Sequence, residues 1–487
     1  MKKIVRREWL LNVSETKVYR AKRKALELIQ GDHRVQYVRL WDYCEIVRIQ
    51  NPGSTAKLKV DRPLPNEGPV FKRMFISYVA QLRGFLAACR PIIGLDACFL
   101  KGPFGGQLMH ATAKDANNQM FPLAFAVVEA EAKESWTWFL ESLMDMIGNP
   151  EEMGWCFISD RQKGLTQTFA QLYPNVEHRY CMRYMYSNFS KVYKGKEWKD
   201  LMWRAASVYT ILEFKQAMEA IKAIDVEAYK YLMSEQPSTW ARCMHGTRSK
   251  CNRMDNNTSE AFNRAIKDAR DQPILTMTES IRRYLMTRLQ TRNHLCQGWK
   301  GNVCLRIRRR VEKACKLMGE CEVIYSGGKI FEVLTTLKTH VMDIGERTYT
   351  CRKWDVSGIP CSHGMAAIIE DKSDPLDFVH ECFHISTVAN IYNFIIKPLP
   401  DQTMWIHTPF NPIGPPPLRK KSGRPKKNRR KGDDEPNKPN GDVRRYYTTL
   451  KCRVCKQPRH NAKTCPQKAN DTTVDQTYAI LNTTSVL

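Results

Sequence analysis

Between residues 91 and 130, apolar stretches alternate with short turn-rich segments. The apolar stretches are PIIGLDACFL (91–100), QLMHATAKD (107–115) and FPLAFAVVEA (121–130), and KGPFGG and ANNQM separate them. Apolar runs of this length, with β-branched residues and with Gly- and Asn-containing segments between them, are typical of β-strands joined by turns. The pattern predicts a meander of three strands.

After residue 130 the apolar residues recur with the spacing of helices in some segments. SWTWFLESLMDMIG (135–148) has the apolar spacing of an amphipathic helix, and WCFISDRQ (155–162) is a short apolar run that contains Asp160. A helix at 164–172 and a strand around VEHRYCM follow. This order predicts a mixed α/β sheet in which the first and fourth strands lie side by side. Asp96 and Asp160 would then face each other near one edge of the sheet.

Helical patterns dominate the flanking regions. Residues 14–50 predict a helix that Ser14 caps and NPGS ends. Residues 186–256 show little β-branched alternation and predict an all-helical insertion. A further helix is expected over 256–270 (NNTSEAFNRAIKDAR), with Ser259 or Thr258 as its cap. Glu260 lies in its first turn, where an acidic side chain often does no more than complement the helix dipole.

Length, charge and cysteine content limit the classes of protein to which this chain can belong. The chain has 487 residues, enough for about three domains. Its 77 Lys and Arg residues exceed its 50 Asp and Glu residues, which gives a net charge of +27. We therefore expect a polyanionic partner, and nucleic acid is the default choice. It contains no run of about 18 apolar residues, and the apolar run at the N-terminus is too short for a signal peptide, so we expect neither membrane insertion nor secretion. In a reducing compartment the 17 cysteines indicate buried thiols or zinc ligands.

Three carboxylates form a candidate site. Asp96 alone, in the middle of an apolar strand, needs a partner: either a metal ion or backbone N–H groups at the end of the strand. Two divalent ions about 4 Å apart can catalyse phosphoryl transfer on DNA, and Mg²⁺ prefers oxygen ligands. Two strand aspartates and a helix glutamate, namely Asp96, Asp160 and Glu260, match that requirement as a set.

A family resemblance is carried by GLDACFLKGPFGGQLMHATAKDANNQMFPLAFAVVEAEAKESWTWFL and continues through WCFISDRQKGL, EHRYCMRYMYSNF and NNTSEAFN. These motifs, in this order, resemble the Mutator-like element (MULE) transposases and their domesticated plant relatives over most of residues 15–465. The resemblance implies an RNase H-like DDE catalytic core at 85–185 and 256–300, interrupted by the helical insertion at 186–255. It places Asp96, Asp160 and Glu260 at the acidic triad, with Mg²⁺ or Mn²⁺ as catalytic ions.

The chain departs from the family pattern in two places. The family carries a Cys-x-x-His pair where this chain has Cys181 and Tyr184. A phenol cannot replace an imidazole as a neutral nitrogen ligand at neutral pH. His178 does not substitute, because on a strand it would face away from Cys181. Residues 1–60 resemble a helical remnant without the family's N-terminal zinc-containing domain, so we expect terminal-repeat recognition to be lost.

A second module is expected at 320–372. A hairpin about Gly327 and Gly328 leads to RTYTCRKWDVSGIPCSHGMAAII, which resembles the SWIM zinc finger with its Cys-x-Cys and Cys-x-His pairs. Tyr349 stands at the position of the first cysteine. Water or a distant thiol such as Cys382 would complete a tetrahedral zinc site. The three ligands that remain are Cys351, Cys361 and His363.

Residues 408–446 predict a disordered basic arm. RKKSGRPKKNRRK (419–431) has no acidic residue, and IGPPP before it cannot pack inside a helix or a sheet. Gly423-Arg424-Pro425 resembles the AT-hook core, which lies in the minor groove of A·T-rich DNA, and the same segment is typical of a nuclear-import signal. The expected nucleic-acid-binding residues are Arg424, Lys426, Lys427, Arg429 and Arg430.

A zinc knuckle is expected at 450–467. KCRVCKQPRHNAKTC has the Cys-x2-Cys-x4-His-x4-Cys spacing, and a module this small has almost no core, so its folding should depend on Zn²⁺. Such knuckles contact single-stranded nucleic acid or protein. The expected ligands are Cys452, Cys455, His460 and Cys465.

A cationic segment at 282–316 includes Arg306, Arg308, Arg309 and Arg310. Helical spacing is expected to spread these side chains around the helix, as a solvated surface or as a DNA-facing wall beside the catalytic sheet.

The sequence is consistent with two alternative functions. One is a MULE transposase-like protein that cuts and joins DNA, with a second copy of the chain as a further candidate partner. The other is a non-catalytic nuclear zinc-binding transcription regulator on the same fold.

Overall fold

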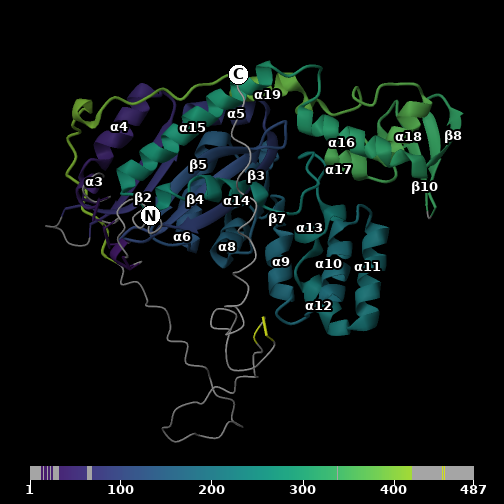
Figure 1. Ribbon diagram of the computed structural model, residues 1–487, viewed down its shortest axis with the longest axis horizontal. Helices are drawn as coiled ribbons and strands as arrows, with labels where there is room; N and C mark the ends of the chain where they lie inside the picture. Colours follow the sequence, from purple (N-terminus) through teal and green to yellow (C-terminus); the bar gives the residue numbers. More distant parts are fainter. Residues whose placement is uncertain are drawn as a thin grey trace, which may run out of the picture. The chain divides into compact units, whose positions relative to one another are not determined.

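The computed structural model divides by its contacts into two units, Met1–Lys420 and Lys421–Leu487. The helices and strands described below all belong to the first unit, in which the main sheet is followed along the chain by a group of helices and then by a smaller sheet (Figure 1). The residues that the structure describes are 32–418, except 63–67 and 337, and isolated positions within 13–25 and 452–455.

A seven-stranded mixed sheet organises the first unit, in the order β1-β2-β5-β4-β3-β6-β7. The strands β3 (Arg90–Phe99), β4 (Gln107–Lys114) and β5 (Met120–Val128) form the predicted antiparallel meander. β6 (Cys156–Ser159) pairs with β3 in parallel, and β7 (His178–Tyr180) pairs with β6 in parallel. The predicted mixed α/β architecture and the pairing of the first and fourth predicted strands are confirmed.

Two strands that the sequence analysis did not predict extend the sheet. β1 (Thr55–Asp61) and β2 (Val70–Ser77) pair with each other, and β2 pairs with β5. In β1 the polar residues Lys57 and Lys59 alternate with Ala56, Leu58 and Val60, and the strand is only partly buried. This alternation is the period-2 pattern of a half-buried edge strand, a signal that the sequence analysis did not use.

The N-terminal helix is interrupted. The Lys17 backbone N–H donates to Ser14 Oγ at 3.3 Å, as expected for a cap at Ser14. The single helix predicted over 14–50 is wrong, because a turn separates its parts. At this turn the Asp32 carboxylate accepts the Arg34 N–H at 2.9 Å, a local bond that competes with helical pairing. The helices that follow are α3 (Val35–Val38) and α4 (Leu40–Gln50).

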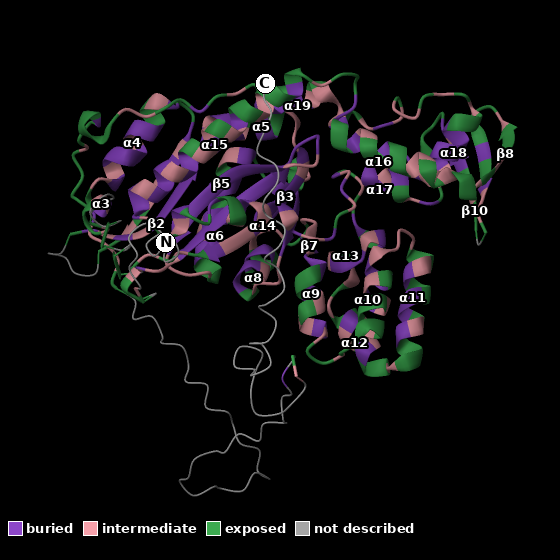
Figure 2. Ribbon diagram, viewed as in Figure 1, coloured by how far each residue is buried: buried purple, intermediate pink, exposed green. Residues whose placement is uncertain are grey.

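Four helices cover the two faces of the sheet: α6 (Lys133–Ile147) and α8 (Lys163–Leu172) on one, and α14 (Asn257–Ala265) and α15 (Ile274–Gln297) on the other. Phe139 of α6 packs against Phe75 of β2, with 5.6 Å between ring centroids. On the opposite face, Phe262 of α14 packs against His110 of β4 at 4.9 Å. As a result β4 and β5 are buried along their whole length (Figure 2).

Helix α14 approaches β3 closely at Gly94. A Cβ atom at Gly94 would lie 2.4 Å from Asn256 Oδ1 and 2.9 Å from Ser259 Oγ, so only glycine permits this contact. The Asn256 side chain donates to the Leu95 carbonyl at 2.8 Å and thereby anchors the start of the helix. The predicted cap at Ser259 or Thr258 is wrong, because both side chains are buried inside the first turn against the sheet.

The region predicted as a helical insertion forms helices in the structure and has its own core. Thr210 and Glu213 form a capping box at the start of α11, with the Glu213 N–H donating to Thr210 Oγ1 at 3.3 Å. Phe214 and Trp240 pack edge to face at 5.6 Å within this core. The helices are α9 (Met182–Phe189), α10 (Lys196–Ser207), α11 (Ile211–Ile224), α12 (Val226–Ser234) and α13 (Pro237–Trp240).

A four-stranded sheet in the order β11-β10-β9-β8 forms the second module. The hairpin about Gly327 and Gly328 is confirmed, and both glycines adopt positive φ, 115° and 59°. Helices precede this sheet, follow it and pack on it. The elements are α16 (Leu305–Lys316), β8 (Glu322–Gly327), β9 (Ile330–Leu334), β10 (Thr339–Asp343), β11 (Thr348–Tyr349), α17 (Lys353–Ser357) and α18 (Ser362–Glu370).

The remaining helices cover the sheet near β5. α5 (Val79–Ala88) packs against α19 (Ile385–Tyr392), and Tyr392 meets Phe121 of β5 edge to face at 5.7 Å. The Tyr392 hydroxyl donates to the buried carboxylate of Asp115 at 2.8 Å. A segment that follows the second module in sequence therefore completes the core of the main sheet.

Candidate catalytic and zinc sites

Asp96 lies on the face of β3 that α14 covers. Gly94 and Asp96 are two residues apart on one strand and share a face. Asn263 of α14 donates to Asp96 Oδ2 at 2.8 Å, and the Ala97 N–H donates to Oδ1 at 2.8 Å. Burial and the charge of Asp160 raise the pKa of Asp96 to about 7, and the charges of Glu131 and Glu260 add to this shift.

Asp160 directly follows β6. Because Gly94 of β3 lies opposite Ile158 of the parallel β6, residue 160 comes level with Asp96. Burial raises the pKa of Asp160, and its Oδ1 atom has no hydrogen-bond partner among the described residues. A buried carboxylate oxygen without a donor is costly and is suited to accepting a cation.

Glu260 projects from the first turn of α14, which the close approach at Gly94 holds against the sheet. The Glu260 carboxylate forms an ion pair with Arg183 of α9, whose Nη1 atom donates to both carboxylate oxygens, at 2.8 Å and 2.7 Å. The Arg183 side chain is 56% exposed, so solvent screens the pair. Glu260 is therefore close to the two aspartates but already has a cationic partner.

A fourth carboxylate, Glu131, was not predicted. It follows β5 in the loop before α6. Burial and the charge of Asp160 raise the pKa of Glu131 to about 7, which places the two carboxylates close together. Its only sequence signal is a position just after a buried strand, within the acidic run EAEAKE.

The position of the family's histidine is next to this cluster. Burial raises the pKa of Tyr184 to about 12, and the charges of Asp96, Asp160 and Glu260 contribute to the shift. Tyr184 therefore brings a neutral phenol to the acidic cluster. Cys181 is buried, and its sulfur accepts the Asn256 N–H at 3.4 Å, so it supports the loop that leads into α14.

The acidic cluster fits hard divalent cations. Its carboxylates supply oxygen donors. Burial raises the pKa values of Asp96, Asp160 and Glu131, and for Asp96 and Glu131 the charge of Asp160 adds to the shift, so a bound cation would stabilise the ionised forms. The structure thus brings the three predicted residues together, while their catalytic role stays a prediction.

The predicted zinc ligands of the second module also converge. Each of Cys351, Cys361 and His363 offers a ligand atom within 4.8 Å of the other two. The two sulfur atoms are 3.4 Å apart, and the hydrogen bond between them lowers the pKa of Cys351 and raises that of Cys361. Ligands at about 2.3 Å from a tetrahedral zinc lie roughly 3.8 Å from each other. The two thiols and the His363 imidazole therefore fit zinc, and the buried Nδ1 atom of that ring has no hydrogen-bond partner among the described residues.

Cys382, which the sequence analysis weighed as the fourth ligand, does not belong to this cluster, and Tyr349 stands in the place of the first cysteine. The Tyr349 ring stacks on Trp354, with 3.9 Å between centroids and 9° between planes. Cys382 lies instead near Arg90 and Lys250, whose charges act on its thiol against the pKa-raising effect of burial. Three protein ligands therefore leave one zinc position to be filled.

A cationic cavity of about 800 Å³ lies between α14, α15 and α16. Lys114 in its lining is buried, and its ammonium donates to Cys251 Sγ at 3.6 Å. No Asp or Glu occurs among the described residues that line the cavity. We name this surface the basic pocket; its cations are Lys114, Arg253, Arg288, Arg306, Arg309 and Arg310.

The expectation that α16 spreads its arginines around the helix is wrong for three of the four. Arg306, Arg309 and Arg310 lie three and four residues apart, so they share a helix face and all line the basic pocket. Arg308 instead donates to the Lys300 carbonyl at 2.7 Å. The cationic segment therefore presents one charged wall rather than a uniformly solvated surface.

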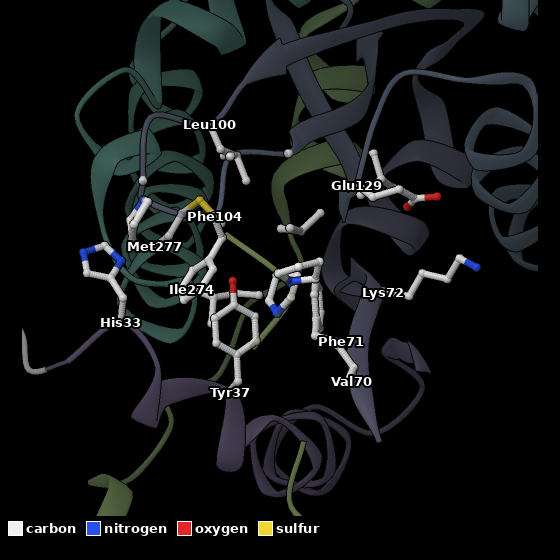
Figure 3. A pocket seen from close by; sticks show the side chains of 18 of the residues that line it. His33, Tyr37, Val70, Phe71, Lys72, Leu100, Phe104, Glu129, Ile274 and Met277 are labelled. Atoms are coloured by element: carbon white, nitrogen blue, oxygen red, sulfur yellow. The ribbon is translucent and has the colours of Figure 1, made fainter. Parts of the chain in front are cut away.

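An apolar pocket of about 220 Å³ lies elsewhere in the first unit (Figure 3). Tyr37 makes edge-to-face ring contacts in it with Phe71 at 5.2 Å and with Phe104 at 5.3 Å. At its rim, Glu129 accepts from Arg73 Nε at 2.9 Å. None of the four clustered carboxylates, Asp96, Glu131, Asp160 and Glu260, is among the described residues that line this pocket.

The predicted tail sites lie almost wholly outside the described residues. This holds for the basic-arm residues Arg424, Lys426, Lys427, Arg429 and Arg430, and for His460 and Cys465 of the knuckle. Cys452 and Cys455 are described, but without the other two ligands they do not define a metal site. The arm and the knuckle therefore stay predictions.

Comparison with known families agrees with both modules. Residues 92–188 match the MULE transposase domain, and residues 350–372 match the SWIM zinc finger. These two matches assign a transposase domain and a zinc finger to separate parts of the chain. The chain contains a MULE transposase domain, which includes Asp96 and Asp160, and a SWIM zinc finger, which includes Cys351, Cys361 and His363. No curated protein gives a significant match.

Proposed function

We propose that this chain is a transposase-like protein that cleaves and transfers DNA strands at an RNase H-like core. The sheet order β5-β4-β3-β6-β7, a meander followed by two parallel strands, supports an RNase H-like core. The observation that carries the proposal is the convergence of Asp96, Asp160 and Glu260 from two neighbouring strands and the helix packed across them.

Mg²⁺ or Mn²⁺ is the proposed cofactor, and two such ions would activate the attacking oxygen and stabilise the leaving one. Asp96 and Asp160 would hold the ions, and Glu260 would complete the set once released from Arg183. Asn263 keeps Asp96 in place through its bond to Oδ2, and its own Oδ1 pairs with the His110 ring at 2.9 Å. The buried His110 thus orients Asn263, and Asn263 orients the carboxylate.

The basic pocket supports DNA as the partner. Helix α14 carries Glu260 toward the acidic cluster, while Asn257, Thr258 and Ala261 of the same helix line the pocket. A cavity lined by cations without carboxylates suits the phosphates of a nucleic-acid backbone. A DNA strand held there would lie on the flank of the helix that carries the third carboxylate.

The decisive experiment incubates the purified full-length chain with duplex DNA and Mn²⁺ or Mg²⁺. Wild type is expected to nick DNA or transfer strands, and Asp96→Asn to lose this activity. Asp96→Asn keeps the size of the side chain and can still accept from Asn263, so loss of activity would report on the metal site. Equal activity in both proteins would overturn catalysis at this site.

The second candidate is a non-catalytic DNA-binding regulator, and the Arg183–Glu260 ion pair favours it. A carboxylate that already has two contacts to a guanidinium is a poor metal ligand, and Tyr184 lacks the chemistry of the family's histidine. Under this alternative the chain binds DNA through the basic pocket without cleaving it. Triad-dependent cleavage would eliminate this candidate.

We further propose nuclear import through residues 419–431 and nucleic-acid or protein contacts through the knuckle. Nine of these 13 arm residues are basic, which supports import. A reporter fused to the intact chain should lose nuclear accumulation when Arg429 and Arg430 are replaced by Gln.

In the described part of the chain, no helix is long and apolar enough to span a lipid bilayer.

A further inference from the structure

The zinc cluster of the second module lacks one ligand of a tetrahedral site. Cys351, Cys361 and His363 supply three. Residue 349 is two positions before Cys351, so its side chain would lie on the same face of the strand. This residue is Tyr349, and its ring stacks on Trp354. A replacement ligand must therefore come from another element that reaches the same face.

Strand pairing points to His340 of β10. β10 and β11 are antiparallel, with Met342 opposite Tyr349 and Asp343 opposite Thr348. The pairing continues beyond β11, because the Thr350 N–H donates to the Val341 carbonyl at 3.2 Å. In this register His340 lies opposite Cys351, and directly opposed residues have Cβ atoms about 5 Å apart on the same face.

The side chains agree with this register. The His340 ring stacks on the His363 ring, with 4.2 Å between centroids and 20° between planes. His340, Cys351 and His363 line one cavity of about 650 Å³ between α11 and the second module. The space in front of the cluster is therefore large enough for an imidazole to turn from the stacked position toward the ligand atoms.

We propose that His340 is the fourth zinc ligand and compensates for the missing cysteine at 349. The ligand set is then two thiolates and two imidazoles, a combination suited to tetrahedral zinc. Binding requires the His340 side chain to rotate out of its stack on His363 so that a ring nitrogen joins the two sulfur atoms and the His363 nitrogen. The inference rests on zinc binding by the SWIM finger.

Cobalt substitution tests the proposal. The full chain carrying Cys452→Ala and Cys455→Ala removes the thiols of the predicted knuckle, so that the signal reports on the SWIM finger. Co²⁺ should give the intense d–d bands of a tetrahedral site in this protein. His340→Ala should weaken Zn²⁺ affinity more than about 100-fold, beyond the effect usual for an outer-shell partner. It should also reduce the d–d intensity, as water enters.

Two further variants separate ligation from a structural role. His340→Cys should restore tight binding and increase the thiolate-to-cobalt charge-transfer band, which a non-ligating position would not do. Tyr349→Phe is the matched control and should leave affinity and spectrum unchanged. Unaltered binding in His340→Ala, or loss of zinc in Tyr349→Phe, would overturn the role of His340. Absence of zinc from the parent protein would instead refute zinc binding by the finger itself.

Discussion

Arg183 donates through one guanidinium nitrogen to both carboxylate oxygens of Glu260, at 2.8 Å and 2.7 Å. The contact joins the first helix of the insertion to the helix that carries the third acidic residue. A metal ion and Arg183 compete for the same oxygens. Arg183 is therefore a candidate switch between a metal-binding and a metal-free site.

Removal of this competitor should strengthen metal binding. Arg183→Ala is expected to raise Mn²⁺ affinity, by no more than about tenfold because the ion pair is solvent-screened. Isothermal titration of Mn²⁺ into the full chain measures this change. Arg48→Ala, which removes an exposed arginine paired with Glu45 at 2.6 Å on α4, serves as the control. Lower Mn²⁺ affinity in Arg183→Ala would contradict the competition.

Glu131 is expected to contribute to the same metal site. Glu131→Gln removes one negative charge next to Asp160 and should lower Mn²⁺ affinity by roughly tenfold, the scale typical of residues that support a metal site. Glu134→Gln is the matched control, because its side chain is 86% exposed and lies in the first turn of the following helix. Equal affinities for the two variants would show that Glu131 does not act on the ions.

The contact at Gly94 should be sensitive to a single methyl group. Gly94→Ala places a Cβ atom 2.4 Å from Asn256 Oδ1, so the helix that carries Glu260 must shift. We expect the free energy of unfolding to fall by about 1–3 kcal/mol in urea titrations, as for other overpacked sites. Gly319→Ala is the control, because among the described residues beyond its chain neighbours no heavy atom lies within 4 Å of its added Cβ. A Gly94→Ala protein as stable as this control would argue against the close packing.

His245 predicts a pH-dependent stability. Burial and the neighbouring Arg179 hold the pKa of His245 well below its usual value near 6.5. The unfolded chain therefore binds a proton at His245 that the folded chain does not, so stability should fall as pH drops below about 6.5. One such group contributes a slope of at most about 1.4 kcal/mol per pH unit.

The difference between two variants isolates this contribution. Urea unfolding at pH 7 and pH 5 should show a smaller loss of stability in His245→Gln than in wild type. His294→Gln, which changes an exposed histidine, should behave as wild type. If His245→Gln loses as much stability on acidification as wild type, His245 is not the proton-binding group.

The basic pocket should set the salt dependence of DNA binding. Arg309→Gln together with Arg310→Gln removes two expected phosphate contacts, so the slope of log affinity against log salt concentration should decrease by about 2. Fluorescence anisotropy with duplex DNA measures it. The control pair, Lys222→Gln with Lys230→Gln, removes the same charge from the insertion surface, where both lysines pair with glutamates. Equal slopes for the two pairs would place the DNA elsewhere.

The strand meander and the three zinc ligands were predictable because their signals are local. Strands β3, β4 and β5 are continuous apolar runs bounded by turns, and Cys361 and His363 are two residues apart at a helix start. Glu131 was not predictable in the same way, because the sequence EAEAKE does not indicate which of its carboxylates lies near Asp160. The edge strand β1, by contrast, carries a local period-2 alternation of polar and apolar residues and was predictable from it.

Sequence by itself determined the nature of the chemistry in this protein: which segments form the central strand meander, which residues carry carboxylates and thiols, and how much positive charge must be accommodated. Only the tertiary structure decided which of these groups meet. Arg183 reaches Glu260 across 77 positions, and Arg306 joins Lys114 in one cavity. Such contacts depend on strand register and helix docking, and these are set by packing of the whole core rather than by any short stretch of residues.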